Sequence, residues 1–343
     1  MKRLTLYFVL SFLALTSFAQ EQWDGGGYSG KTGIAGNLKY LLNDYTHEAM
    51  LDNANTWDGE LNIPSEIECD GQTYTVTSIA WLAFHSCKTL TKVRIPKTVV
   101  EIWHYAEWEE CKNPFDGCTS LERIEVDEAN PSMCSVDGVL FNKDMTRLYC
   151  YPAGAKNETY YVPESVSWLG GDAFADNPYL LSVQMSNNVK QMSFGIFSYC
   201  KNLKSVRLSE NIKYIAAGTF EKCENLKFLD IPESVKSFEE SVFRWSPIDV
   251  IIIRGTFPNG LRKDTFSFMD EERTVIYCQP SEIDNFKNVF KGIVLPIESY
   301  TSGIVSPNQV KNSSTLFDLQ GRCLQKEPAQ SIYIRNGRKY VGR

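Results

Sequence analysis

Apolar and polar positions along the middle of the chain repeat with a period of 23 residues, and a phenylalanine marks the period most clearly. It occurs as Phe174, Phe197, Phe220, Phe243 and Phe266. A helix pattern repeats every three to four residues and a strand pattern every two, so a period this long describes one whole structural coil. The pattern therefore predicts a solenoid, in which similar coils stack on one another.

Within one coil the positions follow the pattern V-x-x-I-(x4)-A/T-F-x-x-C-x-x-L-x-x-V-x-I-P, which is nearly complete in residues 212–232. The segment L-x-x-V-x-I alternates with period two and is rich in β-branched residues, so we expect one short strand in each coil. The proline that follows cannot donate to a ladder of hydrogen bonds and ends the strand. Strands one coil apart are then predicted to align in parallel.

Two interruptions break the period. From Phe84 to Phe115 the spacing exceeds one period by eight residues, and the excess lies in one loop, residues 103–114. From Phe115 to Phe174 the spacing is two periods plus 13 residues. Residues 135–144 in that stretch carry the Asp-Gly and Asn-Lys-Asp sequences typical of turns, so we expect hairpins there in place of a regular coil.

The two ends of the repeat region have a different pattern. Residues 281–292 combine a serine at the N-cap position, apolar Ile283, Phe286 and Phe290, and a closing glycine. This predicts an amphipathic helix that covers the open end of the stack. Strand-like pieces within residues 33–77 predict a cap at the other end.

Beyond a linker-like stretch, two strand-like segments surround the pair Asn336-Gly337, which favours a hairpin. This unit is too small to hold a core of its own.

The start of the chain has a basic beginning, an apolar run and a small-x-small pattern before Gln20, which predicts a secretory signal peptide. The predicted organisation is a signal peptide (1–19), an N-terminal leader and cap (20–60), a solenoid (61–277), a capping helix (278–297), and a linker with a small β tail (298–343).

The net charge and the composition of the chain limit the classes of function that it can have. The chain carries a formal net charge of −7, and removal of the signal peptide takes away two basic residues and no acidic ones. A nucleic-acid binder shows the opposite balance, so we expect no nucleic-acid partner. No apolar run reaches the about 20 residues that a membrane-spanning helix needs. We therefore expect an exported protein without a membrane span.

Ten cysteines in an exported chain raise the question of disulfides. Cys87, Cys118, Cys200 and Cys223 share one repeat position, three residues after a phenylalanine. A small apolar side chain in a stacked interior explains this position more simply, and the parallel Cβ directions of neighbouring coils disfavour a bond between them. The pairing of the other six cysteines cannot be deduced from the sequence.

Signs of catalysis are weak. The three histidines stand in no metal-binding arrangement, and we interpret each as solvated or packed: His47, His85 and His104. Glu107, Glu109 and Glu110 could act as acid and base on a glycan, but adjacent loop glutamates more often form a solvated face. No G-x-S-x-G motif, P-loop or dinucleotide fingerprint occurs. We expect no enzyme activity, no cofactor and no metal.

Candidate binding residues come from the geometry of the strands. In L-x-x-V-x-I the residues that flank the buried valine point outward, which forms rows of mixed charge. Such rows are typical of a protein-binding face and equally of an ordinary solvated one. The candidates on this face are Lys92, Arg94, Arg123, Arg207 and Phe228.

The inserted loop supplies the other candidates, Trp103, Tyr105 and Trp108. Aromatic side chains beside carboxylates in an insertion suit recognition of a protein or of a sugar ring. The alternative is that these rings fold back and cover the edge of the solenoid.

The frame F-x-x-C-x-x-L-x-x-V-x-I-P resembles the BspA-like leucine-rich repeats of surface proteins from Gram-negative gut and oral bacteria, and residues 61–277 carry it. Residues 136–144, followed by 151–154, look like a variant module of that family. The resemblance implies a right-handed leucine-rich-repeat solenoid, α/β or mainly β, with a parallel sheet on its concave face. It also implies adhesion to host proteins and other cells, and a location at the Gram-negative outer envelope.

The end of the chain, residues 317–322 with 332–339, resembles C-terminal sorting-type tails, including those of type IX secretion. It departs from their pattern at Ser331, where a glycine usually precedes the aromatic strand.

The sequence thus predicts an exported, non-enzymatic adhesion module that recognises a host or bacterial surface protein. The alternative is a carbohydrate-binding component of a surface glycan-uptake system.

Overall fold

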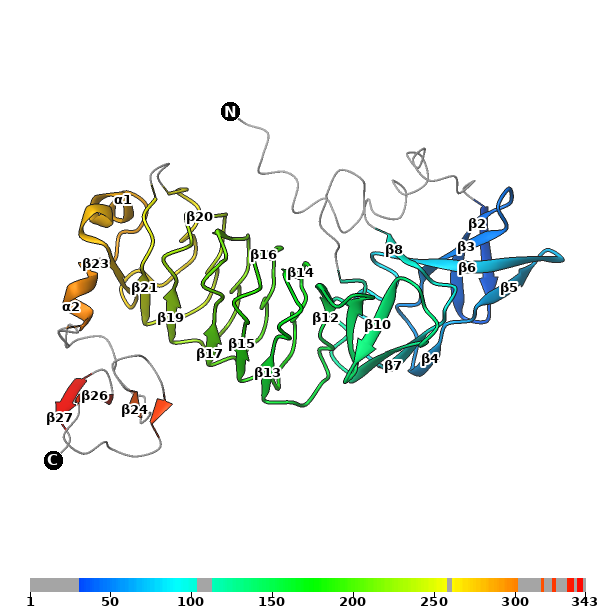
Figure 1. Ribbon diagram of the computed structural model, residues 1–343, viewed down its shortest axis with the longest axis horizontal. Helices are drawn as coiled ribbons and strands as arrows, with labels where there is room; N and C mark the ends of the chain where they lie inside the picture. The colour runs from blue at the N-terminus through cyan, green and yellow to red at the C-terminus, as the bar shows by residue number, and fades with distance from the viewer. Residues whose placement is uncertain are drawn as a thin grey trace.

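The computed structural model describes residues 31–103, 113–257 and 261–301, and the backbone of four short strands beyond residue 315. Coils stack side by side along the long axis of the molecule, from the blue N-terminal end to the orange C-terminal end in Figure 1. Parallel strands predominate and the two α-helices are short. The predicted mainly β solenoid is confirmed.

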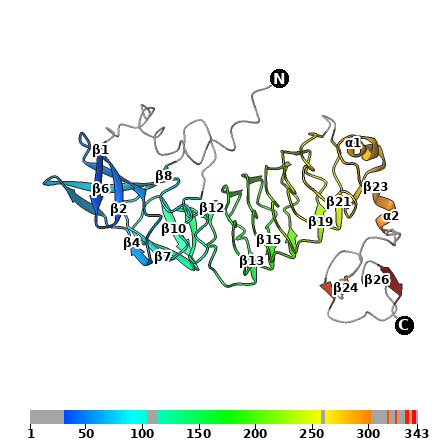
Figure 2. The same ribbon diagram turned by 180° about the vertical axis from the view of Figure 1, so that it is seen from behind.

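The predicted strand of each coil is present, and strands one coil apart pair in parallel. They form a first row of strands along one side of the molecule (Figures 1 and 2). Its members are β4 (Gly59–Asn62), β7 (Leu90–Ile95), β9 (Arg123–Val126), β13 (Thr159–Tyr161), β15 (Ser182–Gln184), β17 (Ser205–Arg207), β19 (Phe228–Ile231), β21 (Val250–Ile253), β22 (Val275–Cys278) and β23 (Ile293–Pro296).

Most coils also add to a second row of parallel strands, and beyond the start of its first member the sequence did not predict this row. Several of these strands have only two residues, so their alternation is too short to recognise. They are held mainly by main-chain bonds between neighbouring coils. The second row contains β6 (Gln72–Ala80), β8 (Glu101–Trp103), β12 (Arg147–Cys150), β14 (Trp168–Leu169), β16 (Gln191–Met192), β18 (Tyr214–Ile215) and β20 (Ser237–Phe238).

Phenylalanine rings stack through the interior between the two rows. Phe174, Phe197, Phe220 and Phe243 are fully buried, and Phe266 is nearly so. Successive ring centroids lie 5.5, 5.7, 6.0 and 5.6 Å apart. The 23-residue period is thus the sequence trace of one continuous apolar stack, and burial of these rings supplies much of the driving force for folding.

The cysteines three residues after a phenylalanine form a second interior ladder. The thiols of Cys118, Cys200 and Cys223 donate to the carbonyl of the phenylalanine one coil earlier, at 2.9–3.2 Å. Burial raises the pKa of Cys200 to about 12. The thiol therefore stays protonated and unreactive. All eight cysteines whose side chains the structure describes are free, so the interior-ladder interpretation is confirmed for this repeat position.

The predicted hairpin replaces a regular coil between the two halves of the solenoid. β10 (Met133–Val136) and β11 (Val139–Asn142) pair antiparallel, and β12 follows. Asp137 and Gly138 both have positive φ, 52° and 84°, which is the type I′ turn that joins two-residue hairpins. Most buried side chains before this insertion form one hydrophobic cluster, and most after it form another.

A mixed sheet, mainly antiparallel, closes the N-terminal end. β1 (Lys31–Ala35), β2 (Leu38–Asn43) and β3 (Glu48–Asn53) form its meander, and β5 (Glu66–Cys69) is paired at the far edge of β6. β6 pairs in parallel with both β3 and β8. One long strand therefore links the cap to the first coil.

The C-terminal cap holds a shorter helix than predicted. A 3₁₀ turn (Pro280–Glu282) leads into α1 (Ile283–Lys287), and neither has a side-chain cap bond. The helix ends early because the chain turns back at Gly292 to place β23 beside β22. Phe286 and Phe290 still cover the ring of Phe266 at the end of the stack, as predicted for a cap.

The chain continues through α2 (Ile297–Thr301) to four strands at its end. β24 (Leu316–Phe317), β25 (Cys323–Leu324), β26 (Ile332–Arg335) and β27 (Arg338–Val341) pair antiparallel. β26 and β27 surround the Asn336-Gly337 pair, which itself lies outside the described residues. The predicted small β tail is thus present.

Candidate functional site

The outward side of the first row of strands carries most of the predicted binding residues, and we call it the strand face. In β4, β7 and β9 the central residues Leu61, Val93 and Ile124 point inward and are buried. Their neighbours along each strand therefore point outward. The register aligns Glu60, Lys92 and Arg123 in one outward row, and Asn62, Arg94 and Glu125 in the next.

Three cations surround the carboxylate of Glu125 on this face. Lys92 Nζ lies 2.9 Å from Oε1, Arg94 Nε 2.7 Å from Oε2, and Arg123 Nε 3.2 Å from Oε1. Glu60 lies farther off, 4.0 Å from Lys92 Nζ. The hydrogen bond from Lys92, and then that from Arg94, hold the pKa of Glu125 below its usual range. We call these five side chains the cation cluster.

The cation cluster is positive on an acidic protein, because three cations face two carboxylates. Arg94 and Arg123 keep more than half of their side-chain surface exposed. Glu125 holds the cations in place, so less side-chain entropy is lost when a partner binds them. The arrangement suits pairing with an acidic surface. The sequence pattern did not predict the central role of Glu125.

Arg207 lies in a different part of the strand face. It belongs to the sheet of β13, β15 and β17, where the register aligns it with Tyr161 and Gln184. Tyr161 is 66% exposed and was not among the predicted residues. The signal that could have found it is its outward position in the segment Tyr160-Tyr161. This row combines an aromatic ring, an amide and a guanidinium.

Phe228 has contacts within the protein. Its ring stacks on that of Tyr300 at 6.2 Å, within a small hydrophobic cluster that also includes Ile252 and Tyr277. α2 brings Tyr300 to this position and so covers the strand face at the C-terminal end. Phe228 is therefore only partly accessible to a partner.

The predicted aromatic loop begins on the other row. Trp103 is the last residue of β8, whose partner is β6 rather than β7 or β9. In Figure 1, β8 lies on the opposite side of the coil from β7. Tyr105 and Trp108 lie outside the described residues, as does the side chain of Trp103. The backbone thus places the start of this loop away from the cation cluster.

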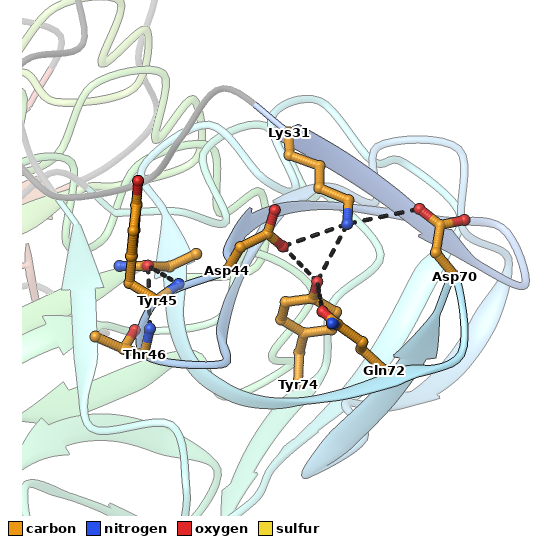
Figure 3. Close-up of polar contacts among 8 residues, drawn as sticks. Lys31, Asp44, Tyr45, Thr46, Asp70, Gln72 and Tyr74 are labelled. Carbon is orange, nitrogen blue, oxygen red and sulfur yellow. Dashed lines mark hydrogen bonds and ion pairs between the residues drawn. The ribbon is translucent and has the colours of Figure 1, made fainter.

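A polar cluster on the N-terminal cap is built from groups that satisfy one another (Figure 3). Lys31 Nζ donates to Asp44 at 3.3 Å and to the Tyr74 hydroxyl at 3.2 Å, and Asp70 lies 3.5 Å away. The hydrogen bond from Tyr74 lowers the pKa of Asp44. Because each charge has a partner, we interpret the cluster as a tie between β1 and its neighbours rather than as a binding site.

A second group of titratable side chains lies in turns on either side of the hairpin insertion. His85 Nδ1 lies 3.2 Å from Asp116 Oδ2. Burial, and then the nearby charge of Asp116, raise the pKa of Asp176 to about 6. Acid–base catalysts use such pairs, but structural pairs shift pKa values in the same way. We therefore treat Asp176 as a determinant of stability.

This pKa has a testable consequence. Because the pKa of Asp176 is raised in the folded state above the ordinary 3.8, folding binds a proton between about pH 4 and pH 6. Stability is therefore highest at the acid end of this window and falls as pH rises through it. We expect Asp176→Asn to remove this fall and to stabilise the protein at pH 7.5 by about 1 kcal/mol, after allowance for solvent screening.

Urea unfolding at pH 4.5 and at pH 7.5 measures the effect. Asparagine suits the comparison because it tolerates the left-handed conformation of Asp176, whose φ is 62°. Equal pH dependence in the two proteins would show that Asp176 has an ordinary pKa.

Within the described ranges, no group of three or more His, Cys, Asp or Glu side chains could hold a metal ion. In the same ranges no helix has both the length and the apolar character required to cross a membrane.

The repeat region of this chain matches a known protein family. The family model of the BspA type leucine rich repeat region matches six copies, over residues 72–135 and 147–268. These residues make up more than half of the chain. The gap between the two ranges contains the turn of the β10–β11 hairpin and β11. No curated protein matches the chain.

Solved structures of bacterial repeat proteins are also similar. The pneumococcal vaccine antigen PcpA is 18% identical with a TM-score of 0.48, over 78% of this chain and 98% of PcpA. A leucine rich cell surface protein from Faecalibacterium prausnitzii is 17% identical with a TM-score of 0.45, over 76% and 97%. A leucine-rich repeat protein from Bacteroides ovatus is 22% identical with a TM-score of 0.43, over 77% and 67%.

Proposed function

The chain belongs to the family of BspA-type leucine-rich repeat proteins, and from this premise we propose that it is an exported, non-enzymatic adhesion module that binds a protein partner through the strand face. The supporting observation is the cation cluster, in which Lys92, Arg94 and Arg123 are held around Glu125. A solenoid presents such a face on a rigid support, so little backbone entropy is lost on binding. The partner is a host or bacterial surface protein with an acidic contact area.

Export is part of this proposal. Residues 1–19 serve as the signal peptide, and residues 298–343 form a linker and a sorting-type tail that directs the protein to the outer envelope. The mature protein is then displayed on the cell surface or released. Cell fractionation of the full chain and of a chain that ends at residue 297 would test the role of the tail, because only the full chain should reach the surface.

Binding to a panel of immobilised extracellular-matrix proteins tests the adhesion proposal. We expect at least one of them to bind the wild-type protein, and the double charge reversal Arg94→Glu with Arg123→Glu to weaken that binding about tenfold. Because screening acts on exposed charges, the difference should shrink as salt is raised. Biolayer interferometry at two salt concentrations measures both effects.

A matched control is the reversal Lys236→Glu, with Lys190→Glu added to equal the change in charge. Both lysines are exposed and lie in the loops before β20 and β16, away from the strand face. Equal loss of binding in the two double variants would show that net charge, and not the cation cluster, governs the interaction. Binding unaffected by Arg94→Glu with Arg123→Glu would remove the strand face from the proposal.

The second candidate is a carbohydrate-binding component of a surface glycan-uptake system. The row of Tyr161, Gln184 and Arg207 favours it, because an exposed ring beside hydrogen-bond donors suits a sugar. A glycan array separates the two functions. Binding to a glycan that is lost on Tyr161→Ala or Trp108→Ala, with no binding to the matrix panel, would favour this candidate. Turnover of any glycan or peptide would contradict both.

A further inference from the structure

One column of turn residues adopts the left-handed backbone conformation in coil after coil. It is the position two residues after the repeat phenylalanine, at the end of each turn. Its φ angles lie between 53° and 74° in seven coils. The residues at this position are Ser86, Gly117, Asp176, Tyr199, Lys222, Trp245 and Phe268.

The fold imposes this conformation. It directs the backbone N–H of the turn residue toward the next coil, so that Tyr199 donates to the carbonyl of Glu221 at 2.8 Å and Lys222 to that of Arg244 at 2.9 Å. Small residues such as Gly and Asp suit a left-handed position, and bulky side chains are disfavoured there. The first three coils follow this preference. The last four instead carry large side chains at a strained position, and such strain is often kept where a residue has a function.

These large side chains form one continuous stack with Arg244. Lys222 Nζ lies 4.3 Å from the ring centroid of Tyr199 and 4.8 Å from that of Trp245. Arg244 Cζ lies 3.8 Å from the ring centroid of Trp245 and 4.9 Å from that of Phe268. The order along the solenoid is therefore aromatic, cation, aromatic, cation, aromatic. We call it the aromatic–cation ladder.

The ladder remains open to solvent. Tyr199 is 37% exposed, Trp245 44% and Phe268 61%. These three are among the large hydrophobic side chains that the described residues leave exposed, and the stack joins them in one patch. Aromatic rings with arginine are the composition of binding hot spots in protein interfaces.

The two cations of the ladder lack acidic partners. Over the described residues no carboxylate lies within ion-pair distance of Lys222 or Arg244, whereas Arg254 pairs with Asp230 at 2.7 Å. The Nε of Arg244 is buried without a hydrogen-bond partner. Lys222 donates to the Tyr199 hydroxyl at 3.0 Å. Stacking thus holds both cations in place while their charge stays uncompensated.

We propose that the aromatic–cation ladder binds an acidic, extended segment of a protein partner. Carboxylates of that segment pair with Lys222 and with the outer N–H groups of Arg244, which stacking leaves free in the plane of the guanidinium. The exposed rings of Tyr199, Trp245 and Phe268 border the same site. A sugar is the poorer occupant because Lys222 and Arg244 already pack against the ring of Trp245.

This site is separate from the strand face. It rests on the proposed function only in that the partner is a protein. The ladder occupies the turns of the last four coils, whereas the cation cluster occupies strands β4, β7 and β9 of the first half. Variants in one surface can therefore be made without change in the other.

Binding of the full mature chain to poly-L-glutamate tests the proposal. We expect measurable binding at low salt, and a loss of about tenfold in affinity for Trp245→Asn and for Arg244→Gln. Because asparagine accepts the left-handed conformation, Trp245→Asn should melt at the same temperature as the wild type or higher. A drop of more than about 5 °C would show that the ring is held for stability and would contradict the proposal.

The controls distinguish binding at the ladder from binding at the cation cluster, and an acidic peptide from an acidic glycan. Arg94→Glu with Arg123→Glu should leave Trp245-dependent binding of poly-L-glutamate intact, whatever happens to matrix-protein binding. Polygalacturonate and heparin serve as acidic glycans. If they bind with the same dependence on Trp245 and poly-L-glutamate does not, the ligand is a glycan and the proposed peptide segment is wrong. No Trp245-dependent binding of poly-L-glutamate would equally overturn it.

Discussion

Replacement of Phe220 by alanine is expected to lower the free energy of unfolding by about 3–5 kcal/mol. The ring is fully buried and lies 5.7 Å from that of Phe197 and 6.0 Å from that of Phe243. Its removal loses the transfer free energy of the ring and leaves a cavity between two coils that cannot close without breaking their main-chain bonds. Urea unfolding followed by circular dichroism measures the change.

Phe268→Asn is the matched control, because it removes the same ring from the same region of the repeat. That ring is 61% exposed, and asparagine suits its left-handed backbone. We expect a change below about 1 kcal/mol. A loss at Phe220→Ala no larger than this would mean that the interior stack contributes little, and would contradict the description of the phenylalanine ladder as the core.

The second large effect is expected at Gly255, just after β21. A Cβ atom added there would lie 2.2 Å from the carbonyl oxygen of Val235 and 3.3 Å from that of Glu233. Both are backbone atoms of the preceding coil, so they cannot rotate away as a side chain would. We expect Gly255→Ala to force the coils apart and to destabilise the protein by about 1–3 kcal/mol, measured by the shift of the thermal transition.

Gly36→Ala is the control for Gly255→Ala. It distinguishes the effect of a close contact with a neighbouring backbone from the effect of a left-handed backbone conformation. Gly36 has a φ of 61°, and a Cβ there would meet no atom within 4 Å. Its substitution costs only the left-handed strain of one alanine, about 1 kcal/mol. If Gly255→Ala is no more harmful than Gly36→Ala, the contact between the two coils is loose enough to accept a methyl group.

The two proposed surfaces differ in how their charges are held. In the cation cluster a carboxylate of the protein itself, Glu125, fixes the cations. In the aromatic–cation ladder the rings of Tyr199, Trp245 and Phe268 fix them, and no carboxylate takes part. A partner must therefore compete with Glu125 at the first surface, whereas at the second it meets cations that form no ion pair with a carboxylate of the described residues.

Much of the fold could be predicted because the same pattern of apolar and polar residues recurs in several coils. The 23-residue spacing of Phe174 and its successors indicated the stack, and the alternation in L-x-x-V-x-I indicated the first row of strands. The Asp137-Gly138 pair indicated the hairpin. The two-residue strands of the second row were missed, since no alternation can be recognised over so short a length. The short capping helix was overestimated because the return of β23 ends it.

The candidate sites were predicted less well. Alternation placed Lys92, Arg94 and Arg123 on one face, and parallel register brought them together as expected. It did not indicate that Glu125 would pair with all three, because ion pairing depends on side-chain directions across strands 31 residues apart. The ladder was also missed. Its aromatic residues follow the same 23-residue period, but exposure at a turn cannot be distinguished from burial by spacing alone.

The sequence by itself thus determined the coil, its length and the side chains that fill it. Apolar side chains that repeat every 23 residues are all buried together when coils of that length stack on one another. Only the tertiary structure decided which outward residues meet. Stacking brings Tyr199, Lys222 and Trp245, each 23 residues from the next, into contact across neighbouring coils. The same stacking raises the pKa of Asp176, by burial and then by the charge of Asp116. It lowers the pKa of Glu125 through hydrogen bonds from Lys92 and Arg94 of another coil.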